Sequence, residues 1–209
     1  MARTTGSDGT RTKTAIRAAA TRLFARYGYE ALSMRRLAEE IDLGAAALYR
    51  YFPTKQAILF DLLKTHMDQL LAAWDAKRPP DRIPARERLN AFAEFHIRHH
   101  WDRNDSLFLS YMELRSLTPD NFAQIEDLRR AYENEVVTII SDGIEEGSLR
   151  PQNARVTARA VIALMNGLPA WYREDGPISP PEIEKLYQQM VSGAAGPDIP
   201  KEIPCSTPA

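Results

Sequence analysis

Apolar residues recur at intervals of three and four over most of the chain, which is the period of an α-helix that buries one face. The first such segment stops at Gly28, a residue type that readily takes the left-handed conformation in which helices end. We therefore expect a first helix that ends at Tyr27. Its apolar face consists of Ile16, Ala19, Ala20, Leu23, Phe24 and Tyr27.

Two short helices are predicted to follow. Ser33 is a good N-cap for the first of them, whose apolar stripe is Met34, Leu37, Ala38 and Ile41. Asp42-Leu43-Gly44 then turns the chain into a helix over Ala45 to Tyr51, anchored by Leu48 and Phe52. Two short helices joined by a tight turn are typical of a helix-turn-helix DNA reader.

From Thr54 onward, every segment again has helical periodicity. Six further helices are predicted, so the fold class is all-α with about nine helices. In the seventh helix we expect Phe122 to face inward, and in the ninth Leu186 and Met190. The six are a helix capped by Thr54 and ended by Pro79-Pro80, one over Pro84 to Trp101, one over Asp105 to Leu114, one from Thr118-Pro119 to Gly147, one over Ala154 to Tyr172, and one opened by the capping box Ser179 to Glu182.

The N-terminal motifs resemble the signature of the TetR family of transcriptional regulators. The residues that carry the resemblance are Leu23-Phe24, Gly28-Tyr29, Ser33-Met34, Leu37-Ala38, Leu48-Tyr49, Tyr51-Phe52 and Lys55. Two positions depart from the usual pattern, because Asp42 stands where Gly is common and Gly44 where Ser usually caps the recognition helix. Asp tolerates the left-handed region and Gly is an acceptable N-cap, so we expect DNA binding to persist.

This resemblance implies a division of the chain into an N-terminal three-helix DNA-binding domain and a C-terminal helical domain for ligand binding and dimerisation. It also implies a homodimer on a pseudo-palindromic double-stranded DNA operator. The expected divisions are a flexible arm over 1–11, the helix-turn-helix domain over 12–55, the ligand-binding and dimerisation domain over 56–193, and a disordered tail over 194–209.

Charge is distributed unevenly along the chain, although the net charge is only −1. Through Lys55 there are ten Lys and Arg against five Asp and Glu, a balance of +5, which leaves seventeen against twenty-three, a balance of −6, for the remainder. A chance distribution is the alternative interpretation. The excess of positive charge nevertheless falls on the part that is predicted to meet phosphate.

The predicted DNA-contacting residues lie in and around the second and third helices. By resemblance, Tyr49, Tyr51 and Lys55 hold phosphates. The residues Ala45, Ala46 and Ala47 permit close approach to the major groove or contact with thymine methyls. Base discrimination is assigned to Arg50 and Arg35, with Ser33 as a further contact, although a solvated helix face is an equal alternative for Arg35.

A second resemblance concerns the C-terminal domain, which looks similar to a subgroup whose effectors are acyl-CoA thioesters. It is carried by segments that include Tyr111 to Arg115, Leu128-Arg129 and Met165-Asn166-Gly167. Such a ligand needs an apolar sleeve and cations for its phosphates. The sleeve candidates are Phe92, Phe108, Tyr111, Met165 and Trp171, and the phosphate candidates are Arg115, Arg129 and Arg130.

Ordinary packing is the alternative for each of these residues. The aromatic side chains can belong to a core, and Arg115 and Arg129 can form ion pairs with Glu113 and with Glu126 or Glu133. Similarly, His96 and His100 share a helix face and could hold a divalent metal. Because His96 continues an apolar stripe, a hydrogen-bonded core histidine is the favoured interpretation and no metal is assigned.

An enzyme is not expected, because the sequence has no nucleophile elbow, phosphate loop or metalloprotease helix. The single cysteine, Cys205, lies in the proline-rich tail. No cofactor, secretory signal or membrane-spanning segment is predicted, so a cytoplasmic location is expected. The preferred function is a repressor released by an acyl-CoA; the alternatives are a regulator of this type that responds to another hydrophobic molecule or a metal ion, and an architectural DNA-binding protein without effector.

Overall fold

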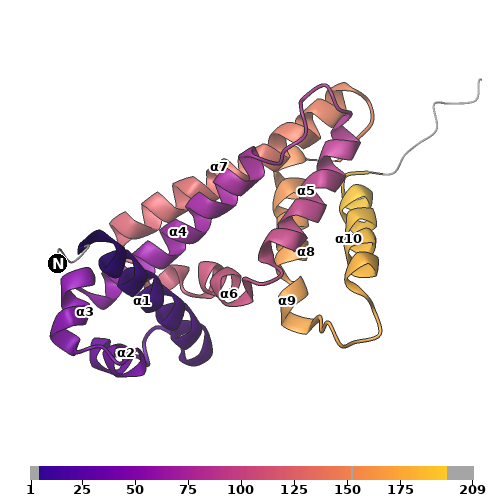
Figure 1. Cartoon of the computed structure of the whole chain (residues 1–209). Coiled ribbons are helices and arrows are strands. Elements are labelled where there is room, and N and C mark those ends of the chain that lie inside the picture. Colours follow the sequence, from indigo (N-terminus) through magenta and orange to yellow (C-terminus); the bar gives the residue numbers. More distant parts are fainter. Residues whose placement is uncertain (1–4, 152, 197–209) are drawn as a thin grey trace, which may run out of the picture. The chain divides into compact units, whose positions relative to one another are not determined.

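The computed structural model describes residues 5–151 and 153–196, which contain helices and no strand (Figure 1). This part confirms the all-α class, and none of its helices is both long enough and apolar enough to cross a membrane. The elements within it are α1 (Thr5–Tyr27), α2 (Met34–Glu40), α3 (Ala45–Tyr51), α4 (Lys55–Asp75), α5 (Ala85–His100), α6 (Asn104–Met112), the 3-10 turn η1 (Leu114–Ser116), α7 (Pro119–Glu145), α8 (Ala154–Asn166), α9 (Leu168–Trp171) and α10 (Pro180–Ala194).

Local capping residues set the bounds of the first helices as predicted. Helix α1 ends at Tyr27 because Gly28 takes a φ of 81°, and the Ser33 hydroxyl accepts a hydrogen bond from the Arg36 amide at 3.2 Å to begin α2. In the turn, Asp42 takes a φ of 51°, the left-handed conformation expected of it. Gly44 then caps α3 without a side-chain hydrogen bond.

Three predicted helix bounds need correction. The arm expected over 1–11 is helical from Thr5, because the segment contains no proline and a helix grows by one hydrogen bond for each added residue. The predicted eighth helix breaks at Gly167, since Pro169 offers no amide to the Met165 carbonyl. The fourth helix already ends at Asp75, before the prolines.

The C-terminal tail is expected to be disordered from residue 194, but the chain is held in place through residue 196. The Ala195 carbonyl accepts from the Arg150 amide at 3.0 Å, and the Gly196 carbonyl accepts from Arg86 at 3.1 Å. Gly196 has a φ of 105°, and a Cβ there would lie 2.9 Å from the Arg150 nitrogen, so a larger residue would not fit. Residues 1–4 of the arm and 197–209 of the tail, with Cys205, lie outside the described residues.

The described part of the chain divides into two compact units. The first comprises residues through Ala72 together with Asp102–Arg129, and the second comprises Ala73–Trp101 and the residues from Arg130 onward. The predicted apolar face of α1, from Ile16 to Phe24, lies in the core of the first unit with side chains of α2, α3 and α4, and with Leu109 of α6 and Ile125 of α7. Tyr27, predicted to lie on the same face, is instead 41% exposed at the end of the helix. The division at residue 55 is therefore a proposal about function, since the hydrophobic core continues past it.

An ion-pair cluster joins α1 to α4 within the first unit. The Arg17 guanidinium donates to both Asp61 carboxylate oxygens, at 2.6 and 2.9 Å, and the Lys13 ammonium lies 3.3 Å from the same group. Burial by itself raises the pKa of the Asp61 carboxyl, but the hydrogen bonds and charges of Arg17 and Lys13 outweigh burial and lower the pKa.

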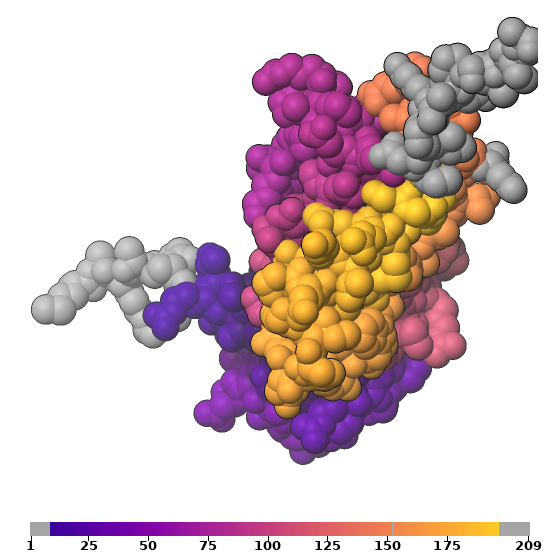
Figure 2. Space-filling view, turned by 90° about the vertical axis from the view of Figure 1, so that its right-hand side faces the viewer, coloured from indigo at the N-terminus to yellow at the C-terminus, as the bar shows by residue number. Residues whose placement is uncertain are grey.

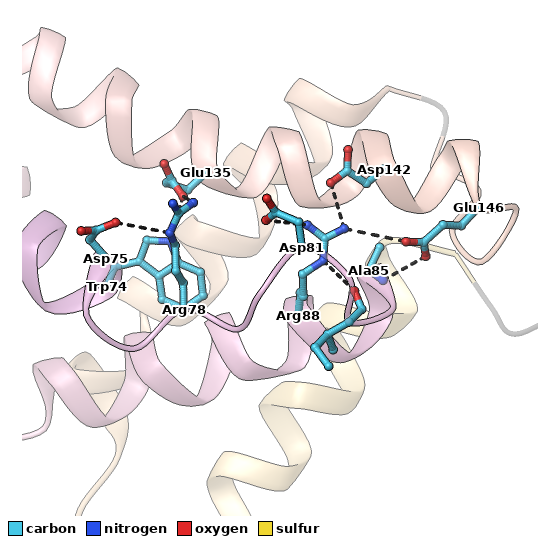
Figure 3. A network of polar contacts seen from close by, with 10 residues as sticks. Trp74, Asp75, Arg78, Asp81, Ala85, Arg88, Glu135, Asp142 and Glu146 are labelled. Atoms are coloured by element: carbon cyan, nitrogen blue, oxygen red, sulfur yellow. Dashed lines mark hydrogen bonds and ion pairs between the residues drawn. The ribbon is translucent and has the colours of Figure 1, made fainter.

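In the second unit, α5, α8 and α10 pack against one another, and a polar network joins the segment after α4 to α7 (Figure 3). Buried Arg88 donates to the Ile83 carbonyl at 2.9 Å and to Asp142 at 2.8 Å. The Trp74 indole donates to Glu135 at 3.1 Å. Because a buried guanidinium must have its hydrogen bonds satisfied, this network specifies where the connecting segment lies.

The lowered pKa of Asp61 predicts a pH-dependent contribution to stability. A carboxyl whose pKa is lower in the folded state contributes above its unfolded value, about 3.9, and loses the contribution as the pH falls through the folded value. Asp61→Asn should reduce the free energy of unfolding by about 1 kcal/mol at neutral pH. Urea denaturation should show the difference from the wild type shrinking near pH 3. Asp68→Asn, which removes a more exposed i,i+4 pair with Lys64, is the control and should have a smaller effect at either pH.

Candidate DNA-binding and effector sites

Helix α3 presents small side chains first and larger polar side chains later. Leu48 is fully buried and anchors the helix in the core, whereas Tyr49 is 50% exposed and Arg50 is exposed. In the described part of the chain, no group forms a hydrogen bond or ion pair with the Arg50 guanidinium. Ala45, Ala46 and Ala47 form the first turn, so the backbone there can approach a groove closely, and half-buried Tyr51 closes the helix.

The α2 candidates are engaged in local interactions. The Arg35 side chain is 85% exposed and pairs with Glu39 at 3.1 Å, one turn along the same helix. Such an exposed pair contributes little to stability and leaves the guanidinium accessible to a phosphate or base. The Ser33 oxygen accepts the capping bond from Arg36, but its hydroxyl proton remains able to donate.

Lys55 has an internal role that the sequence did not reveal. Its ammonium donates to the Tyr29 carbonyl at 3.0 Å, lies 4.1 Å from the centroid of the Tyr29 ring, and is 3.9 Å from Glu30. The side chain is only 24% exposed. An ammonium has three N–H donors, and the Tyr29 carbonyl occupies one of them. The other donors can reach a phosphate, so a phosphate contact by Lys55 stays a proposal.

A junction around Tyr29 also involves residues outside the predicted set. The Tyr29 amide donates to the Glu113 carboxylate at 3.0 Å, and the other oxygen of that carboxylate accepts from the Ser116 hydroxyl at 2.7 Å. Gln56 donates to the Ser116 carbonyl and, at 3.3 Å, to the Tyr29 hydroxyl. Burial raises the pKa of the Tyr29 hydroxyl, aided by the charges of Glu30 and Glu113, so the phenol stays neutral. The backbone amide that binds Glu113 carries no sequence signal.

Helix α6 and η1 bring several effector candidates of the first unit together. Phe108 and Tyr111 are 46% and 38% exposed, and Arg115 is exposed on η1. The Arg129 guanidinium lies 4.5 Å from the Tyr111 ring centroid and donates to the Ser110 carbonyl at 3.0 Å. Two of the anticipated ion-pair partners are engaged elsewhere, since Glu113 binds Tyr29 and Ser116 while Glu133 binds Arg155 and Arg159.

The effector candidates of the second unit differ in exposure. Phe92 is fully buried, with its ring centroid 5.0 Å from that of Trp74 and 5.2 Å from that of Tyr132. Met165 is 2% exposed. Phe92 and Met165 are therefore core residues in this structure, as the packing alternative expected. Trp171 on α9 is 53% exposed, and Arg130 is exposed on α7.

His96 is a hydrogen-bonded core histidine, which confirms the favoured interpretation. Its Nδ1 is 2.9 Å from the Tyr132 hydroxyl and its Nε2 is 3.0 Å from the Asn166 side-chain oxygen. A neutral ring satisfies both contacts, with Nε2–H donating and Nδ1 accepting. His100 Nδ1 donates to the His96 carbonyl at 2.8 Å. Both His96 nitrogens are thus used within the core, which argues against a metal on His96 and His100, and the described residues contain no cluster of three metal-ligating side chains.

Comparison with known proteins identifies both halves of the chain. Residues 16–62 match the family described as bacterial regulatory proteins, tetR family, and residues 82–194 match the one described as tetracyclin repressor-like, C-terminal domain. The solved structure of a tetR-family regulatory protein from Rhodococcus RHA1 is similar with a TM-score of 0.82 and 30% identity, covering 88% of this chain and 96% of that one.

Two further relatives have described functions. The transcriptional repressor KstR2 of Mycobacterium tuberculosis is 25% identical over 177 residues, which are 83% of this chain and 88% of KstR2. The structure of AibR in complex with isovaleryl coenzyme A and operator DNA has a TM-score of 0.77 at 22% identity, covering 90% of this chain and 99% of AibR. At that identity, the likeness to AibR shows the shared fold alone.

The exposed end of α3 leads to a testable DNA contact. Arg50→Ala should weaken binding to operator DNA about tenfold, because one good side-chain contact to a base contributes about 1–3 kcal/mol. Tyr49→Phe, which removes only a hydroxyl, should cause a smaller loss. Fluorescence anisotropy on labelled duplex measures both. Arg82→Ala, which removes an exposed arginine between α4 and α5, serves as the control, and equal losses for Arg50 and Arg82 would contradict the assignment.

Proposed function

The chain belongs to the TetR family of bacterial transcriptional regulators, and we propose that it is a repressor that an acyl-CoA thioester releases from its operator. Members of this family are DNA-binding regulators rather than enzymes. Residues 12–55 carry the DNA reading, and residues 56–193 carry effector binding and dimerisation. The predicted contacts Tyr49, Tyr51 and Lys55 position the protein on the DNA backbone. Arg50 and Arg35 read bases, and Ser33 is a further contact.

The observation that carries the effector class is the mixed chemistry of α6 and η1. Phe108, Tyr111 and Met112 share one side of the helix by their spacing and are all at least 38% exposed. The exposed cation Arg115 follows them on η1, and Arg129 lies against Tyr111. Exposed apolar side chains with a guanidinium group against one of them suit a ligand that has both an acyl chain and phosphates.

The relatives support this choice of ligand. AibR has the same fold and was solved with isovaleryl coenzyme A and operator DNA, and KstR2 is described as a ketosteroid transcriptional regulator. A Fatty acid metabolism regulator protein of Bacillus subtilis is 23% identical over 132 residues, covering 63% of this chain and 68% of that protein. An effector from the breakdown of fatty acids or related compounds is consistent with these neighbours.

Release follows from a difference in affinity between two conformations of the protein. The thioester must bind the DNA-released conformation more tightly than the DNA-bound one, since a ligand with equal affinity for both shifts nothing. Each tenfold preference supplies about 1.4 kcal/mol toward release. Tight binding of the thioester is therefore insufficient by itself.

The effector proposal predicts release of DNA by thioesters. We expect isovaleryl-, octanoyl-, palmitoyl- or benzoyl-CoA to lower the anisotropy of protein bound to labelled DNA from upstream of its own gene. The matching free acids and CoA alone should not do so, because each lacks one half of the ligand. Arg115→Ala should raise the thioester concentration needed for release about tenfold, since a hydrogen bond to a charged phosphate is lost. DNA binding that no thioester disturbs would overturn this effector class and leave metals and other hydrophobic molecules to be tested.

Dimerisation through α8 and α10 is a second proposal, carried by exposed apolar residues on both helices. Figure 2 shows the yellow residues of α10 on the face of the molecule turned toward the viewer. Leu186 and Met190 of α10, predicted to face inward, are each 43% exposed. Gly193 continues their stripe, and a Cβ added there would have nothing within 4 Å, while Val156 of α8 is 63% exposed. A small residue beside large apolar ones permits close packing of helices, as a two-fold interface between copies requires.

The dimer proposal predicts a change of mass for an α10 variant. Leu186→Arg should convert a particle of two chains into one of a single chain, because it introduces a charge into an apolar interface. Light scattering after size exclusion measures the mass, and circular dichroism checks that the helices persist. The control is Lys185→Glu, because position 185 lies about 100° around the helix from Leu186. This variant should remain dimeric. A wild type that is monomeric at micromolar concentration would refute the proposal.

A further inference from the structure

The loop between α1 and α2 is held from a distant part of the sequence by one carboxylate. The Tyr29 amide donates to Glu113 Oε1 at 3.0 Å, across 84 positions of the chain. The loop is short, running from Gly28 to Ser33, and leads directly into α2. Tyr29 itself is 5% exposed, with its ring 5.4 Å from that of Phe24 in an edge-to-face contact. Any displacement of Glu113 would therefore pull on the Tyr29 backbone, which lies immediately before the DNA-reading helices.

Glu113 is also held in place by the segment between α6 and η1, to which it belongs. It is the C-cap residue of α6, and its Oε2 accepts from the Ser116 hydroxyl at 2.7 Å on η1. Gln56, in the first turn of α4, donates to the Ser116 carbonyl and accepts from the Thr118 amide at 3.4 Å. The start of α4, the loop before α2 and the segment after α6 thus meet at one hydrogen-bonded junction.

The same α6 carries the exposed side chains Phe108, Tyr111 and Met112, which end one residue before Glu113. Its C-terminal turn is held by Arg129, whose guanidinium donates to the Ser110 carbonyl. A cation there satisfies a carbonyl that the helix itself leaves unpaired. An anionic ligand that draws Arg129 away, or an acyl chain that packs against Phe108, would change the position of this last turn.

We propose that Glu113 is the positioning residue that couples α6 to the DNA-reading helices, so that displacement of α6 by effector breaks the Glu113–Tyr29 bond and lowers DNA affinity. This inference rests on the proposed function for the identity of the effector. The apolar contacts of the shared core have no preferred direction and tolerate small shifts. A charge-assisted hydrogen bond depends steeply on distance and angle, so it is lost after a displacement that the core survives.

The coupling predicts how a variant should respond to both ligands. Glu113→Ala should weaken DNA binding about tenfold without effector, approaching the effector-bound wild type, because a charge-assisted hydrogen bond is lost. The four thioesters should then cause little further release, while the affinity of the DNA-free protein for the thioester is retained. Asp127→Ala, which removes an exposed carboxylate of α7, should behave as the wild type in both measurements.

A purely structural role for Glu113 gives a different result. Glu113→Ala would then weaken DNA binding, yet the thioester would reduce the affinity by the same factor as in the wild type. That outcome, or unchanged DNA affinity, would overturn the proposal. Glu113→Gln keeps an acceptor oxygen without the charge and should retain part of the coupling, which provides a milder variant if the alanine protein does not fold.

A measurement with DNA alone separates this proposal from the effector assignment. Operator DNA, selected from random duplexes if the upstream region does not bind, should slow amide hydrogen exchange over 107–117 in the wild type and in Asp127→Ala. In Glu113→Ala the slowing should be confined to the DNA-binding helices. If no thioester binds the wild type, the effector class is wrong while this exchange result still decides the coupling. Equal slowing of exchange over 107–117 in all three proteins would refute the proposed coupling through Glu113.

Discussion

The DNA-reading helices depend on burial of the α1 face in a core that also includes α4, α6 and α7. Helices α2 and α3 have seven residues each, too few to be stable as isolated helices in water. Their anchors Leu37 and Leu48 are at most 1% exposed and belong to the same core as Leu109 and Ile125. Burial of a leucine contributes about 2 kcal/mol, so several such contacts are needed to hold each short helix.

A hydrophobic core specifies which faces meet but leaves their exact alignment weakly determined. Directional contacts supply the alignment here. Arg17 and Asp61 fix α1 on α4, Glu113 fixes the loop that follows α1, and Arg88 fixes the segment before α5 on α7 (Figure 3). Each of these groups is satisfied by its partners, and breaking one leaves a buried or half-buried polar group without a hydrogen bond.

In the proposed mechanism, these bonds connect effector binding to DNA binding. The residues that carry the mixed apolar and cationic surface, Tyr111 and Arg115, flank Glu113 in the sequence. Because α6 contributes to the core that holds the DNA-reading helices, a ligand bound on α6 as proposed would act on a unit that already includes them. In the proposed mechanism, a displacement of the last turn of α6 is enough to change the DNA-reading helices.

The sequence by itself determined the local structure, since caps and periodicity are properties of neighbouring residues. Ser33, Asp42, Gly44 and Thr54 end or begin helices as expected, and the start of α3 follows directly from Asp42 and Gly44. The tertiary structure alone decided which faces are covered. Phe122, Leu186 and Met190 fit the inward stripe of their helices yet are exposed, because the width of a buried face depends on what packs against it. It also decided the hydrogen bonds of Lys55 and Glu113, since a bond to a backbone group 26 or 84 positions away leaves no pattern in the sequence.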